Sequence, residues 1–266
     1  MPGAPPTIPP VPTAAFYDAL APVYDRWQAA GGTQPFSHVV LAKLLPALAR
    51  HAREPELPTV ASFVDLGCGT GELLLGLQRA HPRSRLIGID GSAAMLDVAR
   101  AKPDADRVQW IEGTIVAPPA IAPPSLDAAG CFYDAINHLI SADELHEAVR
   151  AVAGLLRPGG LFVFDTTNQL GFDRWWRGNR TWREPGWGVA IETHYDALRR
   201  VAQAEVTIND GDRQTHATLT ERCFIDAEIR SALAAAGFDE LRGEPWSPFD
   251  LDAPGKTWWI GRKRRL

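Results

Sequence analysis

The stretch that decides the fold reads Val64-Asp65-Leu66-Gly67-Cys68-Gly69-Thr70-Gly71-Glu72. An apolar run leads into it, three glycines follow at alternate positions, and a helical pattern starts at Glu72. Glycine permits a sharp turn and leaves bare main chain for a ligand, and the helix start offers unpaired N–H groups to an anion. Asp90 ends a second apolar run, where a carboxylate can accept hydrogen bonds from both hydroxyls of a ribose. The sequence therefore predicts a pocket for an adenosine-containing ligand.

The glycine spacing argues against two other nucleotide-binding motifs. A dinucleotide motif, G-x-G-x-x-G, requires a third glycine where this chain has Glu72, which disfavours a nicotinamide oxidoreductase. A P-loop requires Gly-Lys-Ser/Thr, which the sequence lacks. The string Asp65-x-Gly67-x-Gly69-x-Gly71 instead resembles the first motif of class I S-adenosylmethionine-dependent methyltransferases, and Asp90 falls where those enzymes hold the ribose.

This resemblance implies a set of residues that bind S-adenosylmethionine. The glycines would shape the loop, and Asp65 would position the loop and the methionine end of the cofactor. Where the family has an acidic residue for the adenine amino group, this chain has Thr114, whose hydroxyl can accept one hydrogen bond. The expected cofactor-binding residues are Asp65, Gly67, Cys68, Gly69, Gly71, Asp90, Gly91, Met95, Thr114, Ile115, Phe132 and Tyr133.

A second constellation, residues 130–139, begins at the end of the predicted fourth strand, on the edge where open α/β sheets bind ligands. It resembles a segment of small-molecule N- and O-methyltransferases, including those acting on amino sugars and glycine. The resemblance implies that His138 orients or deprotonates the methyl acceptor, a role that suits an imidazole with a pKa of about 6.5. Alternatively, His138 is a helix-start histidine bonded to the backbone. Tyr133 and Asp134 either line the methyl-transfer channel, or Asp134 caps the following turn.

The segment Phe16–Trp27 is predicted to be a helix and resembles the Tyr-Asp…Tyr-Asp opening of the same enzymes. There the segment closes over the cofactor, which makes Tyr17 and Tyr24 candidates for contact with a ligand. Both tyrosines also share one helical face, as core packing alone would produce. The catalytic candidates are therefore His138, Tyr17 and Tyr24.

Alternating strand and helix patterns predict an α/β, Rossmann-like, seven-stranded sheet. We expect the sheet to be mostly parallel with its last strand antiparallel, helices on both faces, and an antiparallel β insert after strand five. The expected strands are 60–65, 85–90, 108–112, 127–132, 161–164, 238–243 and 257–262. The expected helices are 72–80, 93–100, 143–156 and 226–236, with Ser92 as an N-cap.

The domain boundaries follow from composition. Residues 1–14 are expected to form a disordered, proline-rich leader, and 15–266 the methyltransferase domain. Within it, 166–224 is expected to be a lid or substrate insert, in which 201–208 and 215–223 flank a strong hairpin turn signal. Its tryptophans either form an aromatic lid over the acceptor or anchor the insert onto the sheet.

Composition bounds the class of protein. A net charge of −5 over 266 residues argues against nucleic-acid binding, and no apolar run approaches the ~18 residues of a membrane helix. Three widely spaced cysteines suit reduced thiols, with no disulfide framework and no metal site, so we expect a cytoplasmic protein. We expect a monomer or homodimer that methylates an amine or hydroxyl of a small molecule. The alternatives are a non-catalytic S-adenosylmethionine-binding protein and a protein methyltransferase.

Overall fold

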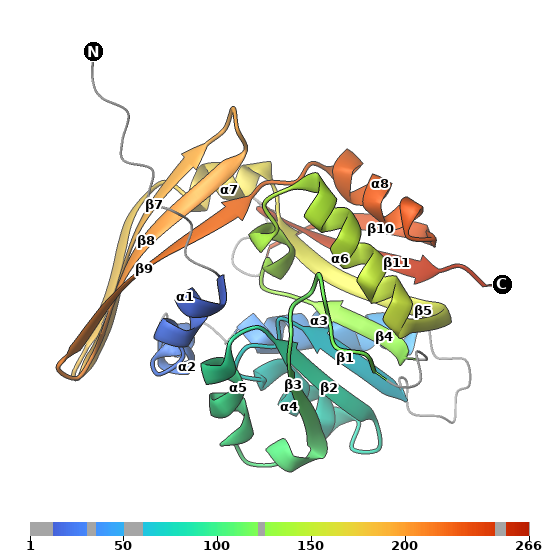
Figure 1. Ribbon diagram of the computed structural model, residues 1–266, viewed down its shortest axis with the longest axis horizontal. Coiled ribbons are helices and arrows are strands. Elements are labelled where there is room, and N and C mark those ends of the chain that lie inside the picture. The colour runs from blue at the N-terminus through green and yellow to red at the C-terminus, as the bar shows by residue number, and fades with distance from the viewer. Residues whose placement is uncertain (1–12, 31–35, 51–60, 122–125, 248–253, 266) are drawn as a thin grey trace.

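The structure is a computed structural model that describes residues 13–30, 36–50, 61–121, 126–247 and 254–265. It contains a seven-stranded sheet and a separate four-stranded sheet (Figure 1). The strands of the large sheet are β1 (Ser62–Leu66), β2 (Arg85–Asp90), β3 (Val108–Glu112), β4 (Leu126–Cys131), β5 (Leu156–Thr167), β10 (Phe238–Trp246) and β11 (Lys256–Lys263). The four-stranded sheet, called the insert sheet below, contains β6 (Gly178–Glu184), β7 (Trp187–Asp196), β8 (Val201–Asp210) and β9 (Arg213–Arg222).

The large sheet has the strand order β10-β11-β5-β4-β1-β2-β3. Neighbours from β3 across to β5 pair in parallel, and β11 pairs antiparallel with both β5 and β10. The predicted mostly parallel sheet with an antiparallel last strand is therefore confirmed. The strand order changes direction between β1 and β4: the chain runs outward from β1 to β3 on one side and from β4 to β5 on the other. Parallel sheets bind ligands at such a switch point.

Helices cover both faces of this sheet, as predicted. They are α1 (Thr13–Leu20), α2 (Tyr24–Ala29), α3 (Phe36–Ala49), α4 (Glu72–Ala80), α5 (Ala93–Arg100), α6 (Ala142–Leu155), α7 (Gln169–Trp175) and α8 (Asp226–Ala235), with the short 3₁₀ turns η1 (Ala105–Arg107) and η2 (Ala135–His138). Val64 and Leu66 of β1 pack with α6 and α8, whereas Phe63 packs with α3 and α4. Because both faces are covered, successive strand residues are apolar and buried rather than alternately polar.

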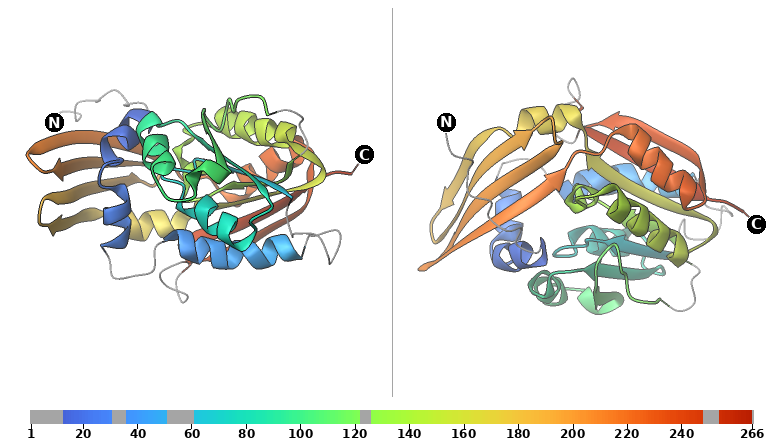
Figure 2. Two further views of the ribbon diagram at one scale, coloured as in Figure 1. Left: turned by 90° about the horizontal axis from the view of Figure 1, so that it is seen from below. Right: turned by 45° about the horizontal axis from the view of Figure 1, so that its top comes forward.

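The insert sheet projects from the end of β5 and α7, and α1 and α2 lie beneath it (Figures 1 and 2). Helix α1 contacts both β9 and α5. A third apolar core joins these elements, with Phe16 and Leu20 from α1, Met95 from α5 and Phe172 from α7. The N-terminal helices therefore bridge the insert sheet and the cofactor-side half of the large sheet.

Two elements differ from the sequence prediction. The predicted helix over residues 16–27 is two helices, because Pro22 has no N–H to continue the hydrogen-bond ladder. Strand β5 begins at Leu156, earlier than predicted, pairs with Leu126, and then bulges before Leu161 pairs with Ala128. Helix α7 and strand β6 were not predicted, and β7 lies in a stretch predicted to be β structure without strand bounds. The proposed leader, apart from its last two residues, lies outside the described residues.

In the described part of the chain, no helix is both long and apolar enough to cross a membrane. The same residues contain no group of three or more His, Cys, Asp or Glu side chains arranged to hold a metal ion. The three cysteines are buried and free.

Candidate functional site

A cavity of about 480 Å³ lies at the carboxyl ends of β1, β2 and β4, beneath α1 and α2. This volume falls in the range of small-molecule sites. Of the residues that we predicted for the site, Gly71 is the one that does not line the cavity. The lining includes Tyr17, Tyr24, Asp65, Gly67, Cys68, Gly69, Asp90, Gly91, Met95, Thr114, Ile115, Phe132, Tyr133 and His138.

The glycine loop is held by the next strand. The amides of Gly67 and Cys68 both donate to the carbonyl of Ile89, at 2.8 and 3.1 Å. Gly69 has a φ of 53° and nothing within 4 Å of the position that a Cβ would take, so a ligand has room to lie against its main chain. Gly71 has a φ of 78°, and a Cβ there would lie 2.4 Å from the Trp110 ring. Gly71 therefore shapes the turn by close packing rather than by lining the pocket.

Asp90 is placed to bind a diol. Its Oδ2 accepts a hydrogen bond from the Gly69 amide and its Oδ1 one from the Ser92 amide, both at 2.8 Å. Each carboxylate oxygen keeps a further lone pair, and the side chain lines the cavity. Burial raises the pKa of Asp90, and the two amide bonds oppose that shift. The arrangement fits the two hydroxyls of a ribose.

Asp65 presents an unsatisfied acceptor. Its side chain is buried, and Oδ1 has no hydrogen-bond partner among the described residues. Burial, and secondarily the Asp90 carboxylate, raise the pKa of Asp65 to about 8. A buried polar atom without a partner is costly, and an ammonium group of a ligand would satisfy it. The donor set around the glycine loop therefore fits S-adenosylmethionine, whose methionine end carries such a group.

Thr114 lines the cavity at the end of β3, and Glu112 does not. The Thr114 hydroxyl oxygen already accepts a hydrogen bond from the Ala117 amide at 3.1 Å. A hydroxyl has two acceptor lone pairs and one donor proton, so Thr114 can still accept one hydrogen bond or donate one to a ligand. The prediction that Thr114 accepts a hydrogen bond from the adenine amino group stays a prediction.

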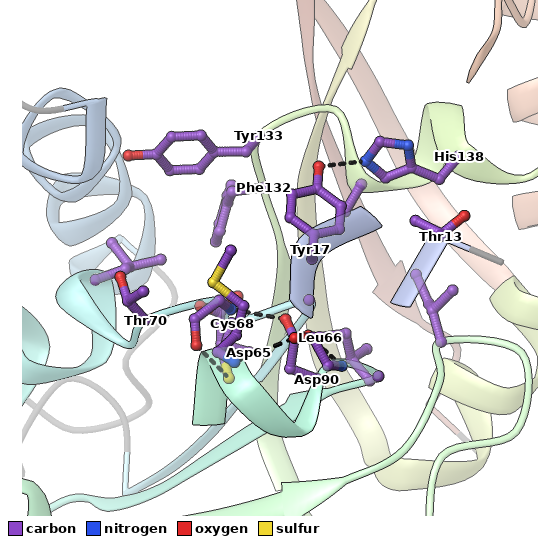
Figure 3. A pocket seen from close by; sticks show the side chains of 18 of the residues that line it. Thr13, Tyr17, Asp65, Leu66, Cys68, Thr70, Asp90, Phe132, Tyr133 and His138 are labelled. Atoms are coloured by element: carbon purple, nitrogen blue, oxygen red, sulfur yellow. Dashed lines mark hydrogen bonds between the residues drawn. The ribbon is translucent and has the colours of Figure 1, made fainter. Parts of the chain in front are cut away.

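His138 and Tyr17 meet at the opposite wall of the cavity (Figure 3). The Tyr17 hydroxyl lies 2.9 Å from His138 Nε2, although the two residues are 121 positions apart. The Tyr24 ring packs edge-on against that of Tyr17, with centroids 6.4 Å apart. Burial, and to a lesser extent Lys256, lower the pKa of His138 to about 4, while Asp134 opposes the shift. His138 is therefore neutral near pH 7 and can accept a proton.

Asp134 follows neither of the two roles considered for it. It is not in the cavity lining, and its side chain makes no cap bond to η2. It pairs instead with Lys256 and accepts a hydrogen bond from the Thr167 hydroxyl at 3.0 Å. Lys256 also lies 2.8 Å from Asp165. The three side chains form an ionic cluster behind the cavity, in which Lys256 and Asp165 are buried. Tyr133 does line the cavity.

The aspartates of the two Tyr-Asp pairs have a role that sequence analysis missed. Asp18 Oδ1 accepts a hydrogen bond from the Ser92 hydroxyl, and Asp25 Oδ1 accepts one from the Thr70 hydroxyl, both at 2.6 Å. Each tyrosine thus faces the cavity while its aspartate holds a cofactor-side loop. The repeated Tyr-Asp dipeptide is the sequence signal from which this role could have been predicted.

The tryptophans of the insert anchor it rather than line the cavity. Trp176 is buried in the third core, and Trp182 packs edge-on against Trp27 of α2 with centroids 5.7 Å apart. Arg26 lies over the Trp187 ring at 5.6 Å. These residues are not among those that line the cavity. Packing onto the N-terminal helices therefore accounts for them.

The chain is similar to known methyltransferases. Residues 63–160 match the family described as "Methyltransferase domain". A 2-phytyl-1,4-naphtoquinone methyltransferase of Thermosynechococcus vestitus is 32% identical over 55% of this chain and 60% of its own length. The CcbJ methyltransferase of Streptomyces caelestis superposes with a TM-score of 0.75 at 21% identity, covering 96% of this chain and 100% of that one.

A solved structure with S-adenosylmethionine bound is also similar. It is that of CalS10, an amino pentose methyltransferase of Micromonospora echinaspora, with a TM-score of 0.66 and 26% identity over 91% of this chain and 96% of that one. The strand order, the glycine loop and the diol-binding geometry of Asp90 agree with these likenesses. The chain therefore carries a methyltransferase domain over residues 63–160, and the comparisons support an S-adenosylmethionine-dependent methyltransferase.

Proposed function

We propose that the enzyme transfers the methyl group to an amine or hydroxyl of a small molecule. The observation that carries this proposal is the Tyr17–His138 pair, which shares one cavity with Asp90 and the glycine loop. Similarity to quinone and amino pentose methyltransferases supports a small acceptor. A cavity covered by α1 and α2, rather than an open groove, favours a small molecule over a protein chain.

S-adenosylmethionine supplies an electrophilic methyl group, so the protein has to orient the acceptor and take its proton. Neutral His138 offers Nε2 as the proton acceptor, and the Tyr17 hydroxyl hydrogen-bonded to that nitrogen can orient the acceptor or pass its proton on. An amine arrives protonated at neutral pH and must lose a proton before it attacks. The base therefore matters more for an amine than for an acidic phenol.

We further propose that residues 166–224 act as a lid. The insert sheet packs on α1 through the third core, and an Arg26–Asp210 ion pair of 2.9 Å joins α2 to the end of β8. Both of these ionic side chains are largely exposed, so the apolar core contributes most of the attachment. Closing this layer over the acceptor would exclude water from the reaction.

The test is methyl transfer from labelled cofactor to a panel of small amines, amino sugars, alcohols and phenols. We expect turnover with one of these classes. His138→Ala is expected to lower kcat by roughly 10²–10⁴-fold, the usual contribution of a positioned base, while affinity for S-adenosylhomocysteine stays unchanged. The matched control is His194→Ala, which removes an exposed histidine of β7 outside the cavity.

Three results would contradict this proposal. Methyl transfer only to proteins in a cell extract would favour a protein methyltransferase. Cofactor binding without transfer to any acceptor would favour the non-catalytic alternative. Full activity in His138→Ala would remove His138 from the chemistry even if small molecules are methylated.

A further inference from the structure

Glu221, in the last strand of the insert sheet, faces the side of His138 that Tyr17 does not occupy. Its Oε1 lies 3.7 Å from His138 Nδ1, and the two side chains are 5% and 12% exposed. His138 Nδ1 and Glu221 Oε2 both lack a hydrogen-bond partner among the described residues. A shift of less than an ångström would bring Nδ1 and Oε1 to hydrogen-bond distance.

The backbone next to these two residues is already fixed. Asn137, immediately before His138, is fully buried and donates from Nδ2 to the carbonyl of Arg222, immediately after Glu221, at 2.8 Å. Its Oδ1 also accepts a hydrogen bond from the Thr167 amide at 2.8 Å. Asn137 thus ties η2, β9 and β5 together. The approach of Glu221 to His138 follows from this junction rather than from chance contact of two side chains.

The charged groups around His138 and Glu221 indicate what this pair can do chemically. Titratable groups act on His138 from four elements: Tyr17 of α1, Glu221 of β9, Asp134 before η2 and Lys256 of β11. Burial lowers the pKa of His138 and raises that of Glu221, so each group alone favours its neutral form. A base with a pKa of about 4 is weak at neutral pH, and a hydrogen bond from Nδ1 to Glu221, formed by closing the 3.7 Å gap, would strengthen it.

We propose that Glu221 is a positioning residue that holds the Nδ1 proton of His138 and thereby directs unprotonated Nε2 toward Tyr17 and the methyl acceptor. This inference rests on the proposed function. As the acceptor's N–H or O–H bond breaks, its proton passes to the Tyr17 oxygen while the Tyr17 proton passes to Nε2, and the electron pair stays on the acceptor atom as the nucleophile. The imidazolium charge then lies against the Glu221 carboxylate. Because Glu221 lies in β9, the insert sheet would both cover the acceptor site and position the His138 base.

The first test needs neither cofactor nor acceptor. The pH titration and tautomer of the His138 imidazole are followed by ¹⁵N NMR in wild type, Glu221→Gln and Glu205→Gln, with the signal assigned by its absence in His138→Ala. Glu205 is an exposed glutamate of neighbouring β8 and serves as the matched control. In Glu221→Gln we expect the His138 midpoint to fall by about one pH unit or more, because an opposite charge this close shifts a pKa by roughly 1–3. An unchanged midpoint and tautomer would overturn the proposal.

A kinetic test follows once an acceptor is known. Glu221→Gln should lower kcat by about tenfold or more and move the acidic limb of the pH–rate profile, with the KM for cofactor unchanged. Glu221→Asp, which restores the charge, should recover part of kcat, and it replaces Glu221→Gln in the NMR test if the glutamine variant does not fold. Equal losses in both variants without a pH change would mean a merely structural role. Failure to find a small acceptor would count against the proposed function and leave the NMR result valid.

Discussion

The cofactor side and the acceptor side of the cavity are built in different ways. The cofactor side uses two short segments after neighbouring parallel strands, the glycine loop after β1 and Asp90 at the end of β2. The acceptor side joins Tyr17 and His138, 121 residues apart, and adds Glu221 from the insert sheet. The first arrangement follows from local sequence, and the second exists only once distant elements have packed together.

The two sides also differ in how completely their polar groups are bonded. Both oxygens of Asp90 accept backbone amides, so the carboxylate proposed to bind the ribose is held in place without a ligand. On the acceptor side His138 Nδ1 and Glu221 Oε2 lack hydrogen-bond partners among the described residues, whereas Asp65 Oδ1 is the corresponding exception on the cofactor side. Groups of this kind are expected where a site still has to adjust to its substrate. The comparison therefore predicts that the cofactor side is rigid and the acceptor side adapts.

The largest expected effect is that of Asp90→Ala on cofactor binding. Two ribose hydrogen bonds to a charged group, each contributing about 1.5–3 kcal/mol, correspond to a loss of affinity of roughly 10²–10⁴-fold. Calorimetric titration with S-adenosylhomocysteine measures it, with Asp97→Ala, an exposed change on α5, as the control. The His138 titration should stay the same. A shift there would show that the two sides are coupled, and retained affinity would remove Asp90 from the ribose site.

A second pair of variants distinguishes a glycine that stabilises the fold from a glycine that contacts the ligand, both within the glycine loop. Gly71→Ala meets both a positive φ and the Trp110 ring, so stability should fall by about 2–5 kcal/mol. Gly69→Ala meets only the positive φ, so stability should fall by about 1–2 kcal/mol while cofactor affinity drops. Urea unfolding and calorimetry measure the two quantities. Equal stability losses would show that Gly69 is as tightly packed as Gly71, and undisturbed affinity in Gly69→Ala would place the ligand elsewhere.

The smallest expected effect concerns Asp65, the unpartnered carboxyl on the otherwise satisfied cofactor side. Its pKa is about 8 in the folded protein, against about 3.9 in an unfolded chain. The folded state therefore binds more protons between these values, and the contribution of Asp65 to stability, fully present below about pH 4, is lost as the pH rises through about 8.

Melting curves of the cofactor-free protein test this sign. The Tm of Asp65→Asn relative to wild type should increase by a few °C between pH 6 and 7, since one pH unit in this range changes stability by about 1.4 kcal/mol and about 1 kcal/mol moves the Tm of a domain this size by roughly 2–4 °C. Parallel curves for the two proteins would mean that Asp65 is not protonated in the fold. Saturating S-adenosylhomocysteine should stabilise wild type more than the variant, because its ammonium group pairs with the carboxylate.

Much of the core could be predicted from hydrophobic periodicity and from the residues that mark the ends of helices and strands. Helices α4 and α5 and strands β2 and β3 have the predicted bounds, because glycine, the Ser92 cap and buried apolar runs mark their ends locally. Strand β6 was not predicted, since it is largely exposed and has no alternating apolar pattern. The buried position of Lys256 was also not predicted, because its partners Asp134 and Asp165 lie far away in the sequence.

The sequence by itself determined the glycine loop, the distance to Asp90 and the alternation of strands and helices, because these depend on neighbours along the chain. It therefore determined the class of cofactor. Only the tertiary structure decided that Tyr17 bonds to His138 and that Glu221 lies behind the imidazole. The physical reason is distance along the chain. Contacts within a turn are encoded by local conformational preference, whereas contacts between remote segments are selected by the burial and packing of the whole fold.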